Sequence, residues 1–404
     1  MAFSMHNKEL DASPFPMTDD LTLLCQDTEH VHSREEFAAK LKLGRPLRVK
    51  LGVDPTAPDI HLGHAVQFRK LRQFQDLGHH VVLIIGDFTA MIGDPSGRTV
   101  TRPPLTHEEV LANAKTFTEQ AFLILDPDKT ETVYNGDWFS KMPFHEVIKL
   151  NARVTMQQML QREDFKNRLA NGQEVRLHEI QYPIMQGWDS VVVRSDIEIG
   201  GTDQLFNVLV GRDLQKSEGM DPQVVISLPL LEGLDGKKKM SKSLGNYVGL
   251  TEAPNEMFGK LMSISDELMP RYYRLVLSET LDTSLHPMEA KKALAQRTVV
   301  LYHNEAAGAE ARADFENKFS KGNIEEADLP EVPCPPAETP LIGFVSQVYT
   351  ETYDQKRSNG EVRRLIQQGS IQLNGEKLSD PKATLTLKAG DVLKLDKKRI
   401  IRLG

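Results

Sequence analysis

Two histidines three residues apart, His61 and His64, are the first residues of the sequence whose type and spacing could do chemistry. On one helix face they could bind a metal ion, but no third candidate ligand stands at a telling spacing and no glutamate is placed as in H-E-x-x-H. They could equally be surface residues at the start of a helix. Phosphate binding is the third alternative. Helix N-termini favour anions, and Gly63 would let a flat group such as a purine lie against the helix.

A lysine-rich stretch, "DGKKKMSKSLGN" at residues 235–246, could also bind phosphate. Its lysines are Lys237, Lys238, Lys239 and Lys242. A run of lysines commonly forms only a solvated surface. Here two glycines bracket the lysines and make the loop mobile, and the serines add hydroxyl donors, which suits a loop that closes over a polyphosphate.

Two acidic residues stand in turn-like segments. Asp94, in "IGDPSG", fits a type I turn, but a carboxylate just after a buried strand could also hold the ammonium group of a ligand. Asp203, in "EIGGTDQLFN", could cap the helix that follows, or it could bind ribose hydroxyls, because Gly200 and Gly201 would let a ligand approach the backbone. Both alternatives stay open for each residue.

The segments around these residues predict a doubly wound, Rossmann-like α/β catalytic domain over residues 1–235. Residues 47–53 and 81–87 read as strands, and apolar residues recur at helical spacing between them, over 61–77. A second unit follows, with strands at 195–201 and 223–231 and a helix between them at 203–217. The loop of residues 54–60 leads into His61 and His64 and is called the histidine loop below. This loop and both acidic turns follow strands, and such sheets bind ligands at the carboxyl ends of their strands.

The rest of the chain predicts further parts. Residues 106–176 are mostly helical and amphipathic in pattern, which indicates an insertion that could carry a self-association surface. Residues 236–247 form the lysine loop, and 248–324 carry helical patterns without strand signals. The acidic, proline-rich residues 325–338 predict a stiff extended linker. Residues 339–404 are then a separate small α/β module.

Composition and charge narrow the function further. The 404 residues carry a formal charge of −8, which argues against nucleic-acid binding over the whole surface. From residue 339 onward, however, 12 Lys/Arg stand against 7 Asp/Glu, so any such contact is expected there. Cys25 and Cys334 support neither a disulfide framework nor a zinc site, and no apolar run is long enough to span a bilayer. We expect a cytoplasmic protein without a membrane or DNA partner.

Together these motifs resemble a known family. "HLGH" and "KMSKS", in this order and about 180 residues apart on an α/β domain, resemble the two signature motifs of class I aminoacyl-tRNA synthetases. "YPIMQGWDS" followed by "GGTDQ" resembles the amino-acid pocket of the tyrosyl-tRNA synthetases. "SNGEVRRLIQQGSIQLNGEKL" resembles the S4-type RNA-binding module at the C-terminus of the bacterial members. The resemblance extends from about residue 47 to the end of the sequence.

The resemblance implies a two-step reaction. The carboxylate of L-tyrosine attacks the α-phosphate of ATP, which gives tyrosyl-adenylate and pyrophosphate, and the 3′ end of tRNA(Tyr) then takes the tyrosyl group. Mg²⁺ would accompany ATP as part of the substrate, with no metal held by the protein itself. The helical residues 248–324 would bind the anticodon region, and the protein would be a homodimer.

The resemblance also assigns a role to each matching residue. The catalytic residues are His61, His64, Lys239, Lys242, Thr56, Arg98 and Arg102. ATP is bound by Gly63, Gly201, Asp203 and Lys242. Tyrosine is bound by Lys50, Asp54, Asp94, Tyr182, Gln186, Asp189 and Gln204. RNA contacts fall to Arg357, Arg363, Arg364 and Lys377.

The residues expected to bind tyrosine differ in the group of the substrate that each would contact. Asp94, Tyr182 and Gln186 would hold the α-ammonium group. Gln204 would face the carboxylate, and Asp189 would take the phenol hydroxyl. Asp189 would thus distinguish tyrosine from an amino acid whose ring lacks the hydroxyl.

The sequence departs from the family at Lys50. Well-known bacterial members carry there a tyrosine whose hydroxyl lies over the substrate phenol. Asp189 would then lack this neutral co-donor, and Lys50 is expected to pair with Asp189 or with Asp87, another acid at this edge.

Three rival interpretations remain. A tryptophanyl-tRNA synthetase would share the catalytic architecture, but the last module and the spacing of Tyr182, Gln186 and Asp189 favour tyrosine. A small nucleotidyltransferase with a similar histidine motif would leave "KMSKS" unexplained. A non-catalytic RNA-binding relic is disfavoured because both signature motifs are intact.

Overall fold

The computed structural model describes residues 17–94, 106–319, 329–336, 338–396 and 399–404. The chain divides into two compact units, Met1–Asn304 and Glu305–Gly404. The first contains a six-stranded sheet with its helices, and the second contains a small α/β module. Among the helices of these residues, none has the length and apolar character that crossing a membrane requires.

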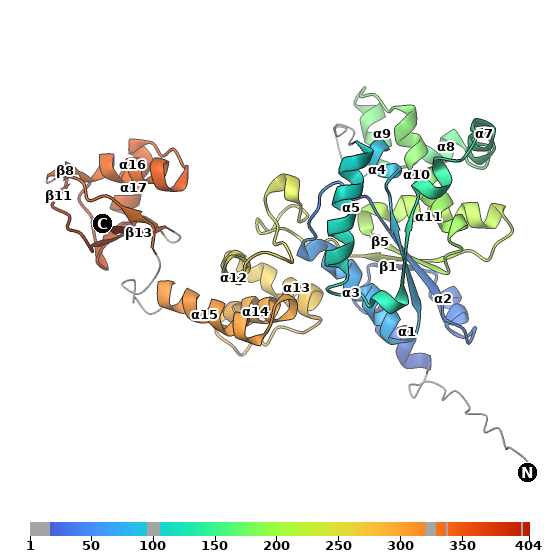
Figure 1. Ribbon diagram of the computed structural model, residues 1–404, viewed down its shortest axis with the longest axis horizontal. Coiled ribbons are helices and arrows are strands. Elements are labelled where there is room, and N and C mark those ends of the chain that lie inside the picture. Colours follow the sequence, from blue (N-terminus) through green and yellow to red (C-terminus); the bar gives the residue numbers. More distant parts are fainter. Residues whose placement is uncertain (1–16, 95–105, 320–328, 337, 397–398) are drawn as a thin grey trace, which may run out of the picture. The chain divides into compact units, whose positions relative to one another are not determined.

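The sheet of the first unit has the strand order β1-β6-β5-β2-β3-β4 (Figure 1). Its strands are β1 (His30–His32), β2 (Arg48–Val53), β3 (His80–Ile85), β4 (Thr130–Tyr134), β5 (Ile197–Gly201) and β6 (Val224–Leu228). All neighbouring strands are parallel except β1, which pairs antiparallel with β6. The strand order changes direction between β2 and β5, and doubly wound sheets bind ligands outside the carboxyl ends of the strands at such a switch point.

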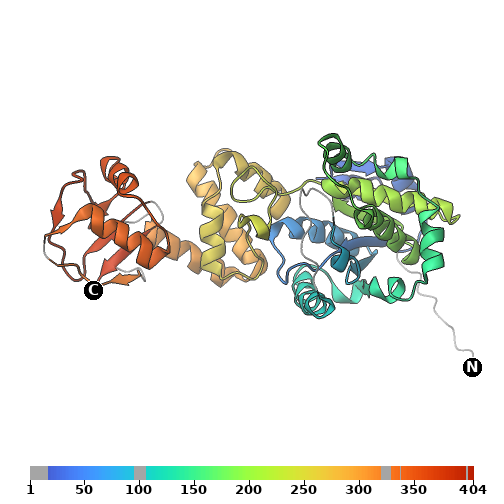
Figure 2. The same ribbon diagram turned by 90° about the horizontal axis from the view of Figure 1, so that it is seen from above.

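Helices cover both faces of this sheet. They are α1 (Met17–Cys25), α2 (Arg34–Leu41), α3 (Leu62–Asp76), α4 (Thr89–Ile92), α5 (His107–Ala121), α6 (Gly136–Phe139), α7 (Phe144–Asn151), α8 (Met156–Met159), α9 (Glu163–Ala170), α10 (Leu177–Val192) and α11 (Leu205–Ser217). Figure 2 shows the yellow-green α11 on one side of the blue strands and the teal α5 on the other. Crossovers between parallel strands are right-handed as a rule, so the two halves of the sheet, which extend in opposite directions from β2 and from β5, carry their connecting helices on opposite faces.

The two predicted strand-helix-strand units are confirmed. β2, α3 and β3 form the first, and β5, α11 and β6 form the second. Five of the six residues of β3 are buried, as its continuous apolar run predicted. α3 has His61 as its N-cap, and Gly78, two residues past its last residue, has a φ of +86°, a conformation that glycine adopts without strain.

Two edge strands differ from the prediction. The stretch 106–176, expected to be mostly helical, also contains β4, which pairs in parallel with β3. α5 and β4 therefore continue the doubly wound sheet, and the insertion begins only after Tyr134. Both β1 and β4 lie at the edges of the sheet and are partly exposed, so neither carries the apolar run of a central strand.

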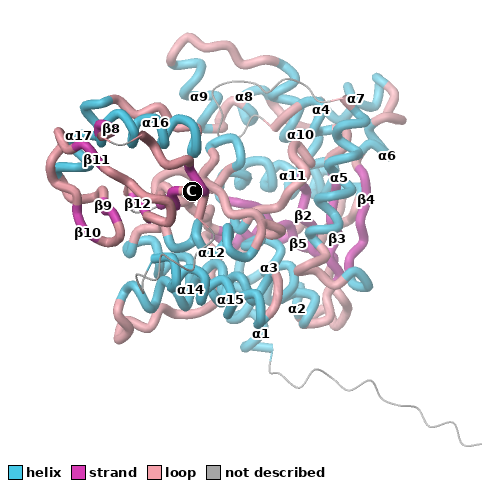
Figure 3. Tube along the Cα trace, turned by 60° about the vertical axis from the view of Figure 1, so that its left-hand side comes forward, coloured by secondary structure: helices cyan, strands magenta, loops and turns pink. Residues whose placement is uncertain are grey.

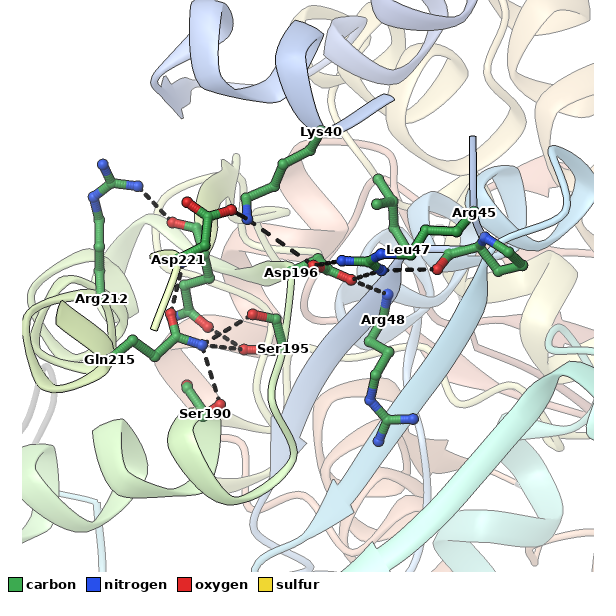
Figure 4. Close-up of polar contacts among 12 residues, drawn as sticks. Lys40, Arg45, Leu47, Arg48, Ser190, Ser195, Asp196, Arg212, Gln215 and Asp221 are labelled. Atoms are coloured by element: carbon green, nitrogen blue, oxygen red, sulfur yellow. Dashed lines mark hydrogen bonds and ion pairs between the residues drawn. The ribbon is translucent and has the colours of Figure 1, made fainter. Parts of the chain in front are cut away.

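Polar contacts hold the amino ends of the central strands together (Figure 4). Asp196, just before β5, accepts hydrogen bonds from the Arg45 guanidinium at 2.7 Å and from the backbone N–H of Arg48 at 2.9 Å. The Lys40 ammonium on α2 lies 2.6 Å from Asp221 and 4.0 Å from Asp196. These contacts fix β2 and β5 at the end opposite the edge that is predicted to bind ligands.

Residues 251–319, all of which the structure describes, contain helices and no strand, as predicted. The helices are α12 (Pro254–Met262), α13 (Met269–Tyr272), α14 (Pro287–Tyr302) and α15 (Glu305–Phe319), with a π-helical turn at Tyr273–Leu277. The first three belong to the first unit, and α15 belongs to the second.

Beyond α15, the second unit is a small α/β module, the type of structure predicted for residues 339–404 (Figure 3). Its elements are β7 (Glu331–Val332), β8 (Thr339–Pro340), α16 (Leu341–Tyr353), α17 (Asn359–Gln367), β9 (Gln372–Leu373), β10 (Glu376–Lys377), β11 (Thr384–Leu385), β12 (Val392–Lys394) and β13 (Ile400–Leu403). Five strands form a sheet in the order β10-β9-β12-β13-β7. Apolar residues of both helices and of β12 and β13 form its core, among them Val345, Ile366 and Ile401.

The linker predicted over residues 325–338 is wrong for part of its length. β7 pairs in parallel with β13, and the backbone N–H of Cys334 donates to the carbonyl of Gly404 at 3.1 Å. Residues 331–332 thus form the edge strand of the sheet in the second unit. Edge strands tolerate proline because one side of the strand needs no ladder hydrogen bonds.

Candidate active site

Backbone pairing brings the histidine loop and the lysine loop together. His61 forms an antiparallel bridge with Gly249, just past the lysine loop. The N–H of Leu62 donates to the carbonyl of Val248, and the N–H of Leu250 donates to that of Ile60, both at 3.0 Å. The start of α3 and the end of the lysine loop are thus held in register, although more than 180 residues separate them.

The two histidines stack on each other. Their ring centroids are 3.9 Å apart, and the His64 ring forms a T-shaped pair with Phe117 on α5. Burial, the neighbouring His64 and Lys242 lower the pKa of His61 to about 2. Burial and the charges of Lys242 and Lys239 lower that of His64 to about 4. Both imidazoles are therefore neutral at pH 7, and the described residues contain no group of three His, Cys, Asp or Glu side chains that could hold a metal ion.

Two lysines of the lysine loop form ion pairs with acids of the sheet edge. The Lys242 ammonium lies 2.6 Å from Asp59, in the histidine loop, and the Lys239 ammonium lies 2.7 Å from Asp203, after β5. Lys237 and Lys238 are exposed, and their backbone N–H groups donate to Asp235. The structure therefore brings Lys239 and Lys242 to the same edge as the histidines.

Asn246, which the sequence reasoning did not single out, holds the lysine loop closed on itself. Its Oδ1 accepts the backbone N–H of Ser241 at 2.8 Å, and its Nδ2 donates to the carbonyl of Lys239 at 3.2 Å. The side chain is buried against Gly233, where an added Cβ would lie 2.2 Å from it. An asparagine one residue after a loop glycine was the available signal, because such side chains commonly bond to nearby backbone.

Gly63, Gly201 and Thr56 also lie at this edge. Gly63 sits beside His61, and a Cβ there would lie 3.0 Å from the His61 ring and 3.5 Å from Met240 of the lysine loop. A Cβ on Gly201 would lie 2.8 Å from Asp203, so neither position has room for a larger residue without a shift. The N–H of Thr56 donates to the carbonyl of Asp54 at 2.8 Å. The predicted Arg98 and Arg102 lie outside the described residues.

A second cluster, next to the first, contains the residues that were predicted to bind tyrosine. The Tyr182 hydroxyl, on α10, donates to Asp54 at 2.8 Å, and Thr89 donates to the other oxygen of the same carboxylate. Burial, followed by the charges of Asp54 and Asp94, raises the pKa of Tyr182 well above its usual value. The hydroxyl is thus a stable hydrogen-bond donor.

Asn207 on α11 joins the two predicted glutamines. Its Nδ2 donates to the Oε1 atoms of Gln186 and Gln204, each at 3.0 Å. Gln204 in turn donates to Asp94 at 2.8 Å. Asn207 is buried, and no local sequence pattern points to it, because its partners come from two separate segments.

Asp189 on α10 is buried and has two neutral donors. The Trp138 indole donates to its Oδ1 at 3.0 Å, and the Asn135 amide donates to its Oδ2 at 3.3 Å. Burial raises the pKa of Asp189 to about 7, against the lowering effects of the Lys50 charge and these two hydrogen bonds. The sequence reasoning missed Trp138 and Asn135, which follow β4, the strand it also missed.

The pairing expected for Lys50 is wrong. Its ammonium lies 2.8 Å from Glu198 on β5 instead of pairing with Asp189 or Asp87. Lys50 and Glu198 are 0% and 1% exposed, and they are register partners where β2 pairs with β5. Asp87 instead accepts the backbone N–H of Gly136 at 2.7 Å. A partner set by strand register could not be read from local sequence.

The predicted RNA-binding residues belong to the second unit. Arg363 and Arg364 are exposed on α17, and Lys377 is exposed on β10. Arg357 lies over the Tyr349 ring, 5.4 Å from its centroid, and 3.6 Å from Glu361.

The edge of the first unit thus offers two sets of groups. Neutral imidazoles and two ammonium groups suit an anionic ligand, and the acids, amides and hydroxyl around Tyr182 suit a zwitterion.

The chain is similar to known synthetases over nearly its whole length. The family described as tRNA synthetases class I (W and Y) matches residues 42–320. The tyrosine–tRNA ligase of Oleidesulfovibrio alaskensis is 50% identical over 406 residues, which cover 96% of this chain and 99% of that relative. The tyrosine–tRNA ligase of Haemophilus influenzae is 47% identical over 404 residues, with 96% and 98% covered.

Solved structures share the fold. A C-terminally truncated mitochondrial tyrosyl-tRNA synthetase of Aspergillus nidulans superposes with a TM-score of 0.61 at 21% identity, covering 75% of this chain and 94% of that one. The tyrosyl-tRNA synthetase of Archaeoglobus fulgidus, complexed with L-tyrosine, gives 0.60 at 20% identity, covering 74% and 100%. The bacterial relatives, at 47–50% identity over 96% of this chain, show more than the fold. The chain belongs to the bacterial tyrosine–tRNA ligases, a family of class I aminoacyl-tRNA synthetases.

Proposed function

We propose that this protein activates L-tyrosine with ATP and transfers the tyrosyl group to the 3′ end of tRNA(Tyr). The observation that carries the proposal is the meeting of the histidine and lysine loops beside the cluster around Tyr182 and Asp189. An anion-binding set and an amino-acid-binding set at one sheet edge are what adenylate formation needs.

The first step requires positioning and charge stabilisation. The tyrosine carboxylate is already a nucleophile, so no side chain has to remove a proton. As it attacks the α-phosphate, the bond to pyrophosphate breaks and negative charge grows on the phosphoryl oxygens. His61, His64 and Thr56 supply neutral donors there, and Lys239 and Lys242 supply positive charge to the leaving pyrophosphate.

Three further assignments concern the nucleotide. The resemblance gives Arg98 and Arg102 to the leaving pyrophosphate. Asp203, with Gly201 next to it, would accept the ribose hydroxyls, and Gly63 would face the adenine. Asp203 is bound by Lys239 in the present structure, so the ion pair has to open when ATP enters. Mg²⁺ would arrive with the phosphates of ATP.

The second cluster matches the groups of tyrosine. Asp94, Tyr182 and Gln186 would surround the α-ammonium group, with Asp54 orienting the Tyr182 hydroxyl. Gln204 would donate to the carboxylate. Asp189 would accept the phenol hydroxyl, with Trp138 and Asn135 as its neutral co-donors. Phenylalanine would leave this buried carboxyl without its partner, which disfavours it.

The remaining parts would bind tRNA. We assign residues 248–324 to the anticodon region and the module of residues 339–404 to an S4-like RNA-binding role, after a linker at 325–338 that β7 shortens. The exposed Arg363, Arg364 and Lys377, together with Arg357, would contact phosphates. Both cysteines are free, which fits a reducing cytoplasm.

A homodimer would use the insertion after β4. Phe144 and Leu177 are each 77% exposed, and Ile148 and Met156 are about half exposed. Large apolar side chains in such number on α7, α8 and the start of α10 indicate an interaction surface. Its burial against a second copy is the simplest explanation.

Pyrophosphate exchange into ATP, measured with each amino acid in turn, tests the proposed function. Tyrosine alone is expected to support exchange. Exchange with tryptophan instead would establish the rival synthetase, and exchange with no amino acid would leave an RNA-binding relic.

A further inference from the structure

Lys50 lies at the junction of three elements. Its ammonium, on β2, donates to Glu198 on β5 at 2.8 Å, and to Ser190 Oγ and the carbonyl of Gln186, both on α10, at 2.7 and 3.0 Å. An ammonium group has three N–H donors, so these contacts use all of them. Lys50 therefore has no donor left for a ligand, and it cannot read the substrate by direct contact.

Its partners are themselves fixed. Glu198 also accepts hydrogen bonds from Ser190 at 2.8 Å and from the side chain of Gln223 at 2.5 Å. β2 and β5 pair in register at Lys50 and Glu198. The network thus anchors one face of α10 to the two central strands of the sheet.

The anchored turn of α10 carries two of the residues proposed to bind the substrate tyrosine. Gln186 and Ser190 are one helical turn apart, and Asp189 lies between them. We infer that Lys50 is a positioning residue for tyrosine recognition: its ammonium fixes the turn that presents Gln186 and Asp189, and its charge stabilises the Asp189 carboxylate. The inference rests on the proposed function and concerns the reading of the phenol hydroxyl.

The charges around Asp189 support the second part of this inference. The titratable groups near it are Lys50 on β2, Glu198 on β5 and Tyr182 on α10, with Asp87 bonded to Gly136 beside α6. Burial raises the pKa of Asp189, Lys50 lowers it, and Glu198 raises it. Loss of the Lys50 charge should therefore favour the protonated acid, which is a poorer acceptor for a phenol hydroxyl.

The test is the pH dependence of kcat/KM for tyrosine in pyrophosphate exchange, for the full-length wild type and for Lys50→Met. Wild-type kcat/KM is expected to rise with pH around 7, as Asp189 ionises. The Lys50→Met profile should move upward by about one pH unit, and near pH 7 its preference for tyrosine over phenylalanine should fall about tenfold. A role in folding alone would lower activity at every pH without moving the midpoint.

Three further variants separate charge from anchoring. Lys50→Met/Glu198→Met removes both charges and should shift the midpoint less than Lys50→Met. Ser190→Ala keeps the charges but loosens α10, so it should raise KM for tyrosine several-fold and leave the midpoint in place. Lys40→Met removes another buried lysine, at the opposite end of the strands, and should change neither.

The outcomes distinguish the two proposals. A wild type that shows no tyrosine-dependent exchange overturns the proposed function itself. If the wild type exchanges with tyrosine, an unmoved midpoint and an unchanged tyrosine preference in Lys50→Met overturn the inference alone. If neither Lys50 variant folds, Ser190→Ala decides, and an unchanged KM for tyrosine in that variant overturns the positioning role.

Discussion

Lys242 and Asp59 are 183 residues apart in the sequence, yet the ammonium of one lies 2.6 Å from the carboxylate of the other. Asp59 stands two residues before His61, so this ion pair joins the lysine loop to the start of α3. Lys239 and Asp203 make a second link of the same kind. In both cases a carboxylate pairs with a lysine that, under the proposed function, binds the phosphates of ATP.

Removing the ammonium of Lys242 should therefore slow adenylate formation strongly. We expect Lys242→Met to lower kcat for pyrophosphate exchange by roughly 10²–10³-fold, because the developing charge on pyrophosphate loses a preorganised partner. Tyrosine binding, measured in the absence of ATP, should not change. Asp59→Asn is the matched control, since it frees Lys242 without removing it and should lower KM for ATP or leave it unchanged. A large rise in KM for ATP in Asp59→Asn would show that the acid itself serves the nucleotide.

The two buried histidines should make stability depend on pH. Their pKa values in the folded protein, about 2 and about 4, are below the ordinary 6.5, so only the unfolded chain takes up protons on them as the pH falls from 6.5. Their contribution to stability is complete above pH 6.5 and is lost progressively below it, down to about pH 4 for His64 and about pH 2 for His61. The Tm of His64→Asn, measured by thermal unfolding, should accordingly fall less than the Tm of the wild type when the pH is lowered from 7 to about 5.

Asp189 requires that this comparison be made between variants. Its raised pKa of about 7 works in the opposite direction, because the folded protein binds that proton first. Subtracting the wild-type curve from the His64→Asn curve removes the Asp189 term.

Substitutions of Asn207 and of Asn246 should weaken the binding of different substrates. Asn207 bonds both glutamines of the tyrosine cluster, whereas Asn246 bonds the backbone of the lysine loop. We expect Asn207→Ala to raise KM for tyrosine about tenfold with little change for ATP, since each lost buried hydrogen bond costs roughly 1 kcal/mol. Asn246→Ala should do the reverse. If both variants raise both KM values alike, the two clusters are not separate.

The parts of the site that could be predicted are those with a local signal. Apolar runs identified β3 and β6, and the loops after the strands carried His61, Asp94 and Asp203 to one edge, because parallel strands end together. The edge strand β4 is partly exposed and has no continuous apolar run, so it was missed, and with it Trp138. The partner of Lys50 depends on the register of β2 against β5, which only the assembled sheet determines.

The second unit offers a test of RNA binding through salt dependence. Arg363 and Arg364 are exposed on α17. If each contacts a phosphate, each releases counterions, so Arg363→Ala/Arg364→Ala should weaken binding of tRNA and reduce the slope of log K against log salt concentration by about 1 per contact. Tyrosine-dependent pyrophosphate exchange, which needs no tRNA, should be unchanged. Lys216→Ala, an exposed lysine on α11 of the first unit, is the control for a nonspecific loss of charge. An equal change of slope in that control would mean that net charge, and not the surface of α17, governs the affinity for tRNA.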